Sequence, residues 1–169
     1  WSSDVCSSDL MFNKEKHIVP TVNRKYTKKY ISIDYGTQNP TTFGMYGKDD
    51  KGQWYKIKEY HHSGREEKLQ KTDVEYADDL EQFMEYTKSI QVIVDPSAAS
   101  FIAELRKRKI KVKKAKNDVL EGIRNVGNAL KNSLILFNDC NIETFKEFET
   151  YIWDEKSSLK GEDKPVKEN

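Results

Sequence analysis

Residues 30–47 have the sequence YISIDYGTQNPTTFGMYG, which contains the clearest strand pattern in the chain. The apolar Ile31 and Ile33 alternate with the polar Ser32 and Asp34, and a period of two is typical of a β-strand. A turn beginning at Gly36 follows. Asp34, at the end of the predicted strand, admits three interpretations: a metal ligand, part of a phosphate-binding loop, or simply the polar end of a strand.

Two more strands are predicted over residues 41–46 and 54–60, on either side of the turn GKDDKG at residues 47–52. Thr72 and Glu75 then have the spacing of a capping box, which predicts a helix from Asp73 to Lys88. Apolar residues recur along this helix at intervals of three and four, so five of them are expected to face the core: Val74, Ala77, Leu80, Phe83 and Met84.

The segment IQVIVDPSAAS, residues 90–100, predicts a central strand because its first half is apolar on both faces. The strand ends at Asp95, since Pro96 cannot continue it. Ser97 is expected to cap the next helix. The residues of that helix expected to be buried share helical spacing: Ala98, Phe101, Ile102 and Leu105.

Short strands are expected at residues 110–112 and 134–137. Between them, Asp118 and Glu121 predict the start of a helix with four inward apolar residues, Val119, Ile123, Val126 and Leu130. A last helix is marked by Ile142, Phe145, Phe148 and Ile152. The order of elements predicts an α/β fold with a mixed sheet, in which an antiparallel three-strand meander precedes alternating helices and strands.

The composition is that of a polar globular domain. The chain has 169 residues, 36% of them hydrophobic and 34% charged, with a net charge of +1. No apolar stretch is long enough for a membrane-spanning helix or a signal peptide. The two cysteines, Cys6 and Cys140, form neither a disulfide framework nor a zinc pattern, which suits a reducing interior.

Three segments are expected along the chain. Residues 1–10, WSSDVCSSDL, resemble translated sequencing-adaptor sequence and are interpreted as non-native. Residues 11–29 show no clear period and include several basic residues, which is typical of a linker. Residues 30–169 are expected to form one domain that is truncated at its C-terminus, because the chain stops in the polar segment KGEDKPVKEN.

Asp34 and Asp95 each follow an apolar strand and precede a turn. In an open α/β sheet, ligands bind beyond the strand ends, so neighbouring parallel strands would bring both carboxylates into one small volume. A divalent cation such as Mg²⁺ prefers oxygen ligands and relieves their repulsion. The alternative is that either aspartate caps a helix or lies in solvent at a strand end.

The motif IDYGT at residues 33–37 also fits the first phosphate loop of the sugar-kinase, actin and heat-shock ATPase group. That hypothesis requires a second lobe and a second glycine-rich loop with an aspartate. Asp95 is instead followed by Pro96, which has no backbone N–H to donate, and no glycine follows. The chain is also too short for two such lobes, so the ATPase hypothesis is rejected.

Charge is distributed unevenly along the chain. Residues 106–116, RKRKIKVKKAK, contain eight basic residues and no acidic one, whereas the helix predicted from Asp73 is strongly acidic. A phosphate backbone would favour such a basic stripe near Asp95, and Lys114 and Lys116 are the candidate DNA contacts. The alternative is a solvated helix end and edge strand. The adjacent His61 and His62 are not expected to bind a metal, because no third ligand is evident.

Four segments of the chain resemble the C-terminal nuclease domain of tailed-bacteriophage terminase large subunits. They are the region from YISIDYGTQNPTTFG to VEYADDL, then VIVDPSAASFIAELRKR, VKKAKNDVLEGIRNV and WDEKSSLKGEDKPVKEN. The resemblance covers residues 26–169. It implies a ribonuclease H-like fold and a two-metal-ion endodeoxyribonuclease, dependent on Mg²⁺ or Mn²⁺, that cuts concatemeric double-stranded viral DNA during packaging.

The resemblance also implies residue roles and partners. The two metal-binding, catalytic aspartates of the family correspond to Asp34 and Asp95, while its third acidic ligand is expected beyond Asn169, so this chain is expected to be impaired. Residues 11–29 would connect to a preceding ATPase domain. The expected partners are the small terminase subunit and the portal, and the expected location is the cytoplasm of an infected bacterium.

Two other functions stay open from the sequence. One is a DNA-binding module on a ribonuclease H-like fold that does not cut. The other is a different nuclease with that fold, such as a resolvase or a transposase core.

Overall fold

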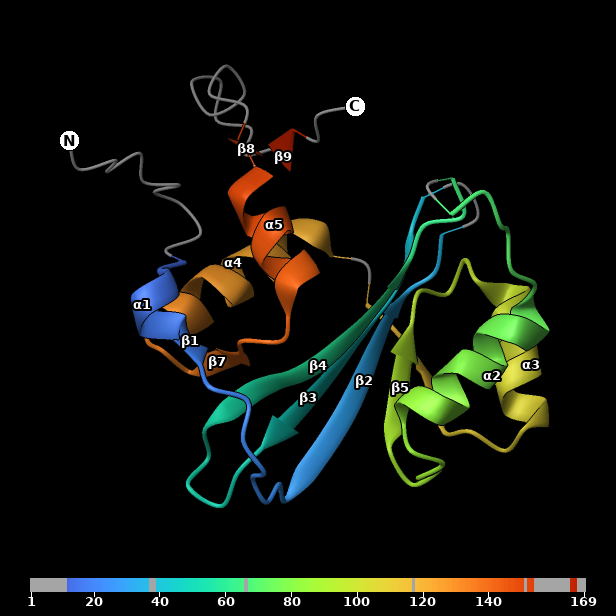
Figure 1. Cartoon of the computed structure of the whole chain (residues 1–169), viewed down its shortest axis with the longest axis horizontal. Helices are drawn as coiled ribbons and strands as arrows, with labels where there is room; N and C mark the ends of the chain where they lie inside the picture. The colour runs from blue at the N-terminus through green and yellow to red at the C-terminus, as the bar shows by residue number, and fades with distance from the viewer. Residues whose placement is uncertain are drawn as a thin grey trace.

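A mixed sheet with strand order β1-β7-β4-β3-β2-β5-β6 forms the centre of the molecule (Figure 1). The computed structural model describes residues 12–36, 39–65, 67–116, 118–150, 152–153 and 165–166. A separate pair, β8 and β9, lies outside this sheet. No helix among the described residues is long and apolar enough to cross a membrane.

The strands of the main sheet are β1 Ile18–Val19, β2 Lys28–Asp34, β3 Thr41–Lys48, β4 Trp54–His62, β5 Gln91–Val94, β6 Val112–Lys114 and β7 Ile135–Asn138. The helices are α1 Lys14–His17, α2 Asp73–Phe83, α3 Ala99–Lys107, α4 Val119–Lys131 and α5 Ile142–Thr150. The small pair consists of β8 Ile152–Trp153 and β9 Pro165–Val166.

The predicted topology is confirmed. Strands β2, β3 and β4 form an antiparallel meander, and β5 then lies parallel to β2 on its other side. Strand β6 adds in parallel to β5, and β7 adds in parallel to β4 at the far end of the meander. The result is a mixed α/β sheet in which helices alternate with the later strands, as the order of sequence patterns predicted.

Two hydrophobic clusters stabilise the two halves of the sheet. The larger joins β2, β3 and β5 to α2 and α3, and its fully buried members include Ile31, Phe43, Leu80 and Phe101. The smaller surrounds Leu130 of α4, with contributions from β7 and α5. Figure 1 shows α2 and α3 beside β5, whereas α1, α4 and α5 gather near β7.

The acidic helix α2 differs from its prediction in two respects. It ends at Phe83 instead of Lys88, because Glu85 and Tyr86 adopt positive φ angles of 52° and 56° and turn the chain toward β5. Val74, which was expected to be buried, is 50% exposed, and Tyr76 is buried instead. The inward positions of Ala77, Leu80, Phe83 and Met84 are confirmed.

The prediction that Ser97 caps α3 was wrong. The helix begins at Ala99, and its N-cap residue Ala98 makes no side-chain capping bond. The carboxylate of Asp95 instead accepts a hydrogen bond from the backbone N–H of Ser97, at 2.7 Å between Oδ1 and N. The aspartate therefore closes the turn that precedes the helix.

Helix α4 begins as predicted, since Asp118 Oδ1 accepts the N–H of Glu121 at 3.0 Å. Its apolar face is less buried than periodicity indicated. Leu130 is buried, but Val119 is 65% and Val126 43% exposed. The predicted last helix stops at Thr150, and Ile152 belongs to β8.

Part of the segment expected to be a linker packs into the domain. Within residues 11–29, α1 and β1 are ordered, and β1 pairs in parallel with β7. His17 is fully buried, and its Nε2 lies 2.8 Å from the carbonyl oxygen of Leu130. Residues 1–10 lie outside the described residues, so their interpretation as non-native stays a prediction.

Replacing Thr72 by Ala is expected to lower the free energy of unfolding by about 1 kcal/mol. In the capping box, Glu75 N–H donates to Thr72 Oγ1 at 3.3 Å and Thr72 N–H donates to Glu75 Oε2 at 2.7 Å. Urea denaturation would measure the change. Thr72→Ser keeps the hydroxyl acceptor and should be nearly neutral; equal losses for both variants would contradict the capping explanation.

Candidate active site

Asp34 and Asp95 lie at the same edge of the sheet on neighbouring strands. Strands β2 and β5 are adjacent and parallel, and Ile33 pairs with Val94 at the end of their ladder. Asp34 directly follows Ile33 as the last residue of β2, and Asp95 directly follows Val94, the last residue of β5. The geometric condition for a shared site, adjacent parallel strands with aligned ends, is therefore met, while the role of the aspartates as metal ligands stays a prediction.

Strand alternation determines which face these carboxylates occupy. Ile33 and Val94 are buried in the cluster beneath α2 and α3. Asp34, one residue after Ile33, therefore lies on the opposite face of the sheet, where it is exposed. On that face Asp34 pairs with Thr42 of β3, and Thr42 pairs with His61 of β4. A polar row thus crosses the sheet beside its edge.

The aspartates are chemically suited to a hard cation. Carboxylate oxygens are the ligands that Mg²⁺ and Mn²⁺ prefer, and Asp34 is accessible to solvent. The bond from Ser97 N–H to Asp95 Oδ1 fixes the orientation of the second carboxylate. Within the described residues, no group of three or more His, Cys, Asp or Glu side chains is close enough to hold a metal by itself.

A cavity of about 240 Å³ opens beside Asp34 on the same face. Strands β2, β3 and β4 contribute one wall and α5 the other, and the titratable residues lining it are Asp34, Tyr46, Lys56, Glu59, Tyr60, His61, Glu143 and Glu147. The cavity is therefore rich in carboxylates. A cation would be favoured there, and an unaccompanied phosphate would not.

Glu59 is the most constrained carboxylate of this cavity. Its side chain is 11% exposed, and its Oε2 lies 3.1 Å from the ammonium of Lys56, which is equally buried. The backbone N–H of Glu143 donates to its Oε1 at 2.7 Å, and the Thr144 hydroxyl donates to Oε2. Glu59 of β4 therefore caps the first turn of α5 across the tertiary structure.

These contacts determine how Glu59 titrates. Burial by itself would raise its pKa, but the hydrogen bond from Thr144 and the charge of Lys56 outweigh burial and lower the pKa. Glu59 is therefore ionised and paired at neutral pH. Sequence analysis did not identify it, because no local pattern shows that its partners would come from a helix 84 residues away.

The two histidines have different environments. His62 is buried, its Nε2 lies 2.9 Å from the carbonyl oxygen of Leu69, and its Nδ1 lies 2.9 Å from Glu67 Oε1. It holds the loop that follows β4. His61 instead lines the cavity beside Asp34. The prediction that His61 and His62 do not bind a metal is not tested by these contacts and stays a prediction.

Lys114 and Lys116 lie near the edge of the sheet at which β2 and β5 end, called the aspartate edge below. Both are exposed, and neither lines the cavity just described. Lys114 ends β6 and pairs with Val94, so it lies on the face opposite Asp34, and Lys113 pairs with Ile93 on the face of Asp34. Lys116 follows two residues after the end of β6. Their contact with DNA stays a prediction.

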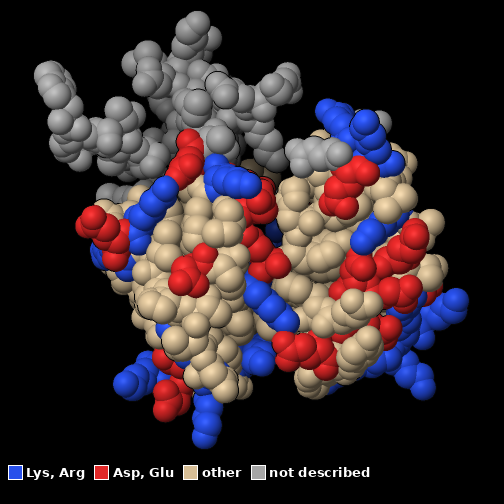
Figure 2. Space-filling model, viewed as in Figure 1, with Lys and Arg blue, Asp and Glu red and all other residues tan. Residues whose placement is uncertain are grey.

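Part of the basic stripe has a structural role. Arg108 is 17% exposed and contacts Asp78 and Glu81 of α2, at 2.6 and 3.1 Å from its Nη1, and also Glu104. Hydrogen bonds from Arg108 to Glu104 and Asp78 raise its pKa, which keeps it charged. Figure 2 shows acidic side chains over α2, and part of that acidic surface is used to bind Arg108.

No protein-family model and no curated protein match the chain. Among solved structures, the large terminase from a thermophilic bacteriophage, in complex with ADP, is 60% identical, with a TM-score of 0.88. That match covers 94% of this chain and 40% of the terminase chain, so the present chain spans less than half of its relative.

Two more distant structures share the fold. The P22 large terminase nuclease domain is 14% identical with a TM-score of 0.75, over 96% of this chain and 85% of that one. The large terminase nuclease from thermophilic phage G20c with bound magnesium is 14% identical with a TM-score of 0.65, over 95% and 88% of the two chains. At this identity the similarity establishes the architecture alone.

Proposed function

Because the chain is related by sequence to bacteriophage large terminases, we propose that it is the metal-dependent endonuclease part of such a protein. The observation that supports this most directly is the position of Asp34 and Asp95 at the aligned ends of adjacent parallel strands. The fold is that of terminase nuclease domains. The substrate proposed is concatemeric double-stranded viral DNA, cut during genome packaging.

In the proposed mechanism, Asp34 and Asp95 would hold the divalent ions. A bound pair of Mg²⁺ or Mn²⁺ ions would supply a water of lowered pKa and favourable charge for the attacking and leaving oxygens of a phosphodiester. The G20c nuclease with bound magnesium supports this class of cofactor. The Ser97 N–H keeps the Asp95 carboxylate oriented, and the rigid strand end positions Asp34.

Other parts of the proposal concern the longer protein. The large terminase that is 60% identical to this chain extends well beyond the matched region. We propose that an ATPase domain precedes this chain, that a third carboxylate follows Asn169, and that the small terminase subunit and the portal are partners. Lys114 and Lys116 are proposed to contact phosphates, and the site of action is the cytoplasm of an infected bacterium.

The function is tested by incubating supercoiled plasmid with the 169-residue chain in Mn²⁺, in Mg²⁺ and in chelator. We expect slow nicking with metal, faster in Mn²⁺ than in Mg²⁺, because the third carboxylate is proposed to follow Asn169, and none in chelator. Cutting that persists in chelator would contradict a metal-dependent mechanism. DNA binding without cleavage in any metal, both by this chain and by a longer chain that includes the third carboxylate, would support the non-cutting module in place of the nuclease.

A further inference from the structure

A second cavity, of about 330 Å³, lies at the same edge of the sheet as the aspartates, between the loops that follow β2 and β4. Tyr35 and Tyr76 form its apolar part. The polar lining comes from the two loops: Gly36, Asn39, Gly64, Arg65, Gln70 and Lys71. Among the described residues that line it, two are cationic and none is a carboxylate. Its described lining therefore carries cationic side chains, whereas the lining of the cavity beside Asp34 is rich in carboxylates.

The two cations of this cavity are not equivalent. Lys71 Nζ lies 2.6 Å from Asp79 Oδ2, so its charge is already neutralised. Arg65 is exposed and forms no ion pair with the other described residues. Of the two cations that line this cavity, Arg65 is thus the one whose positive charge is not paired with a described carboxylate.

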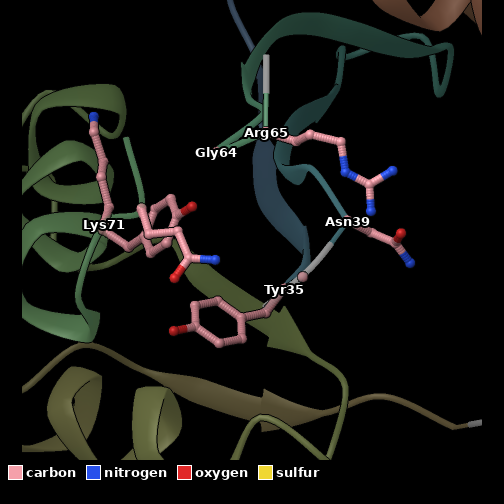
Figure 3. A pocket seen from close by; sticks show the side chains of 8 residues that line it. Tyr35, Asn39, Gly64, Arg65 and Lys71 are labelled. Carbon is pink, nitrogen blue, oxygen red and sulfur yellow. The ribbon is translucent and has the colours of Figure 1, made fainter. Parts of the chain in front are cut away.

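Figure 3 shows how the lining side chains are directed. The Tyr35 ring points toward the helices and stacks on Phe101 with ring centroids 4.7 Å apart. Arg65 and Asn39 extend to the other side, away from Lys71. Because consecutive residues of an extended chain point in opposite directions, Asp34 also faces away from the Tyr35 ring. In Figure 3, Arg65 and Asn39 likewise project away from the Tyr35 ring, which is the direction expected for Asp34.

Described residues in both loops are held in place by specific contacts. A Cβ atom at Gly36 would lie 2.2 Å from the carbonyl oxygen of Asn39, so only glycine allows this close approach. Thr41 Oγ1 donates to the Gly36 carbonyl oxygen at 3.1 Å. In the second loop, the N–H of Leu69 donates to the carbonyl oxygen of Gly64 at 3.1 Å, and His62 contacts that same turn. The groups facing the cavity are therefore presented from positioned backbone.

We propose that Arg65 and Asn39 form a phosphate subsite that binds the DNA backbone next to the phosphodiester held at Asp34 and Asp95. A guanidinium offers several donors in a planar fork that matches phosphate oxygens, and the Asn39 amide adds another donor. The acidic cavity beside Asp34 repels DNA unless metal is present. An adjacent cationic subsite allows the backbone to dock and the scissile phosphate to be positioned. This inference rests on the proposed nuclease function.

The test compares Arg65→Gln with Arg106→Gln in the 169-residue chain. Arg106 is also exposed but lies in the last turn of α3, which runs away from the aspartate edge. Fluorescence anisotropy of a labelled duplex, in chelator and over a range of salt concentrations, reports binding without cleavage. Loss of one phosphate contact should weaken binding about 5- to 10-fold at about 0.1 M salt and reduce the salt slope by about 0.9. Arg65→Lys should retain most of the slope.

The outcomes separate this inference from the proposed function. If wild type cuts plasmid with metal and Arg65→Gln binds duplex as wild type does, the subsite is refuted and the nuclease proposal stands. Equal weakening by Arg106→Gln would also refute it, because the effect would then be one of net charge. If wild type neither binds nor cuts DNA, both proposals fail. Selective weakening by Arg65→Gln supports the subsite.

Discussion

Asp34→Asn and Asp95→Asn are each expected to lower the metal-dependent rate of plasmid nicking by at least about 100-fold, which corresponds to about 2.7 kcal/mol of activation free energy. Each change replaces an anionic oxygen donor with a neutral amide at the proposed metal site. Neither should unfold the protein. Asp34 is exposed, and an Asn at position 95 retains the oxygen that accepts the Ser97 N–H.

Asp50→Asn is the matched control for this prediction. Asp50 is exposed in the turn between β3 and β4, and this turn lies at the Lys28 end of β2, opposite the aspartate edge. Initial nicking rates in Mn²⁺ and circular dichroism of each variant provide the measurement. A folded Asp34→Asn variant that cuts as fast as wild type would refute the site assignment, and a loss in Asp50→Asn would show that the effect is not local.

Glu59→Ala is expected to have the largest effect on stability, lowering the free energy of unfolding by about 3–5 kcal/mol. The change leaves the ammonium of Lys56 without its carboxylate in a site where that side chain is 11% exposed. It also removes the acceptor for the N–H groups of Glu143 and Thr144 at the start of α5. Urea denaturation near neutral pH measures the loss.

Two further variants test this explanation. Glu149→Ala removes the partner of Lys14 in an ion pair whose side chains are 53% and 61% exposed, and it should cost less than about 1 kcal/mol. The double change Lys56→Met and Glu59→Leu removes both buried charges and should be less destabilising than Glu59→Ala alone. A double variant that is less stable than Glu59→Ala would show that the unpaired charge is not the main cause.

The contribution of Glu59 to the free energy of unfolding should also decrease at acidic pH. Its folded-state pKa is lowered, against burial, by Thr144 and Lys56, so it lies below the unfolded value of about 4.3. The stabilisation is therefore fully present above the unfolded pKa and is lost as the pH falls through the folded pKa. The stability difference between wild type and Glu59→Gln should be constant near neutral pH and shrink below about pH 4.

Features that depend on neighbours within a few residues were predictable from sequence. The Thr72–Glu75 capping box and the Asp118 N-cap form as expected, because their bonds span three residues. The buried positions of β2 and of α3 follow from periods of two and of three to four. The prediction that Ser97 caps α3 was wrong, although it also concerned neighbouring residues. The Asp95 carboxylate accepts the Ser97 N–H and closes that turn instead.

Features that depend on what covers a surface were not predictable. Periodicity identified the apolar side of α4 and placed Val74 on the inner side of α2. It gives no information on whether another element packs there, and Val74, Val119 and Val126 are in fact exposed. The basic stripe likewise appeared uniform in sequence, yet Arg108 is engaged by three carboxylates from α2 and α3.

The sequence by itself determined the order of the strands and helices from β2 to α5, the caps at α2 and α4, and the two strands that precede the turns at Asp34 and Asp95, because each depends on local spacing and steric preference. Only the tertiary structure decided that those strands are parallel neighbours, that Glu59 caps α5, and that Arg65 and Asn39 line one cavity. Those relations join residues far apart in the chain, and they arise from sheet pairing and burial, which minimise free energy over the whole domain.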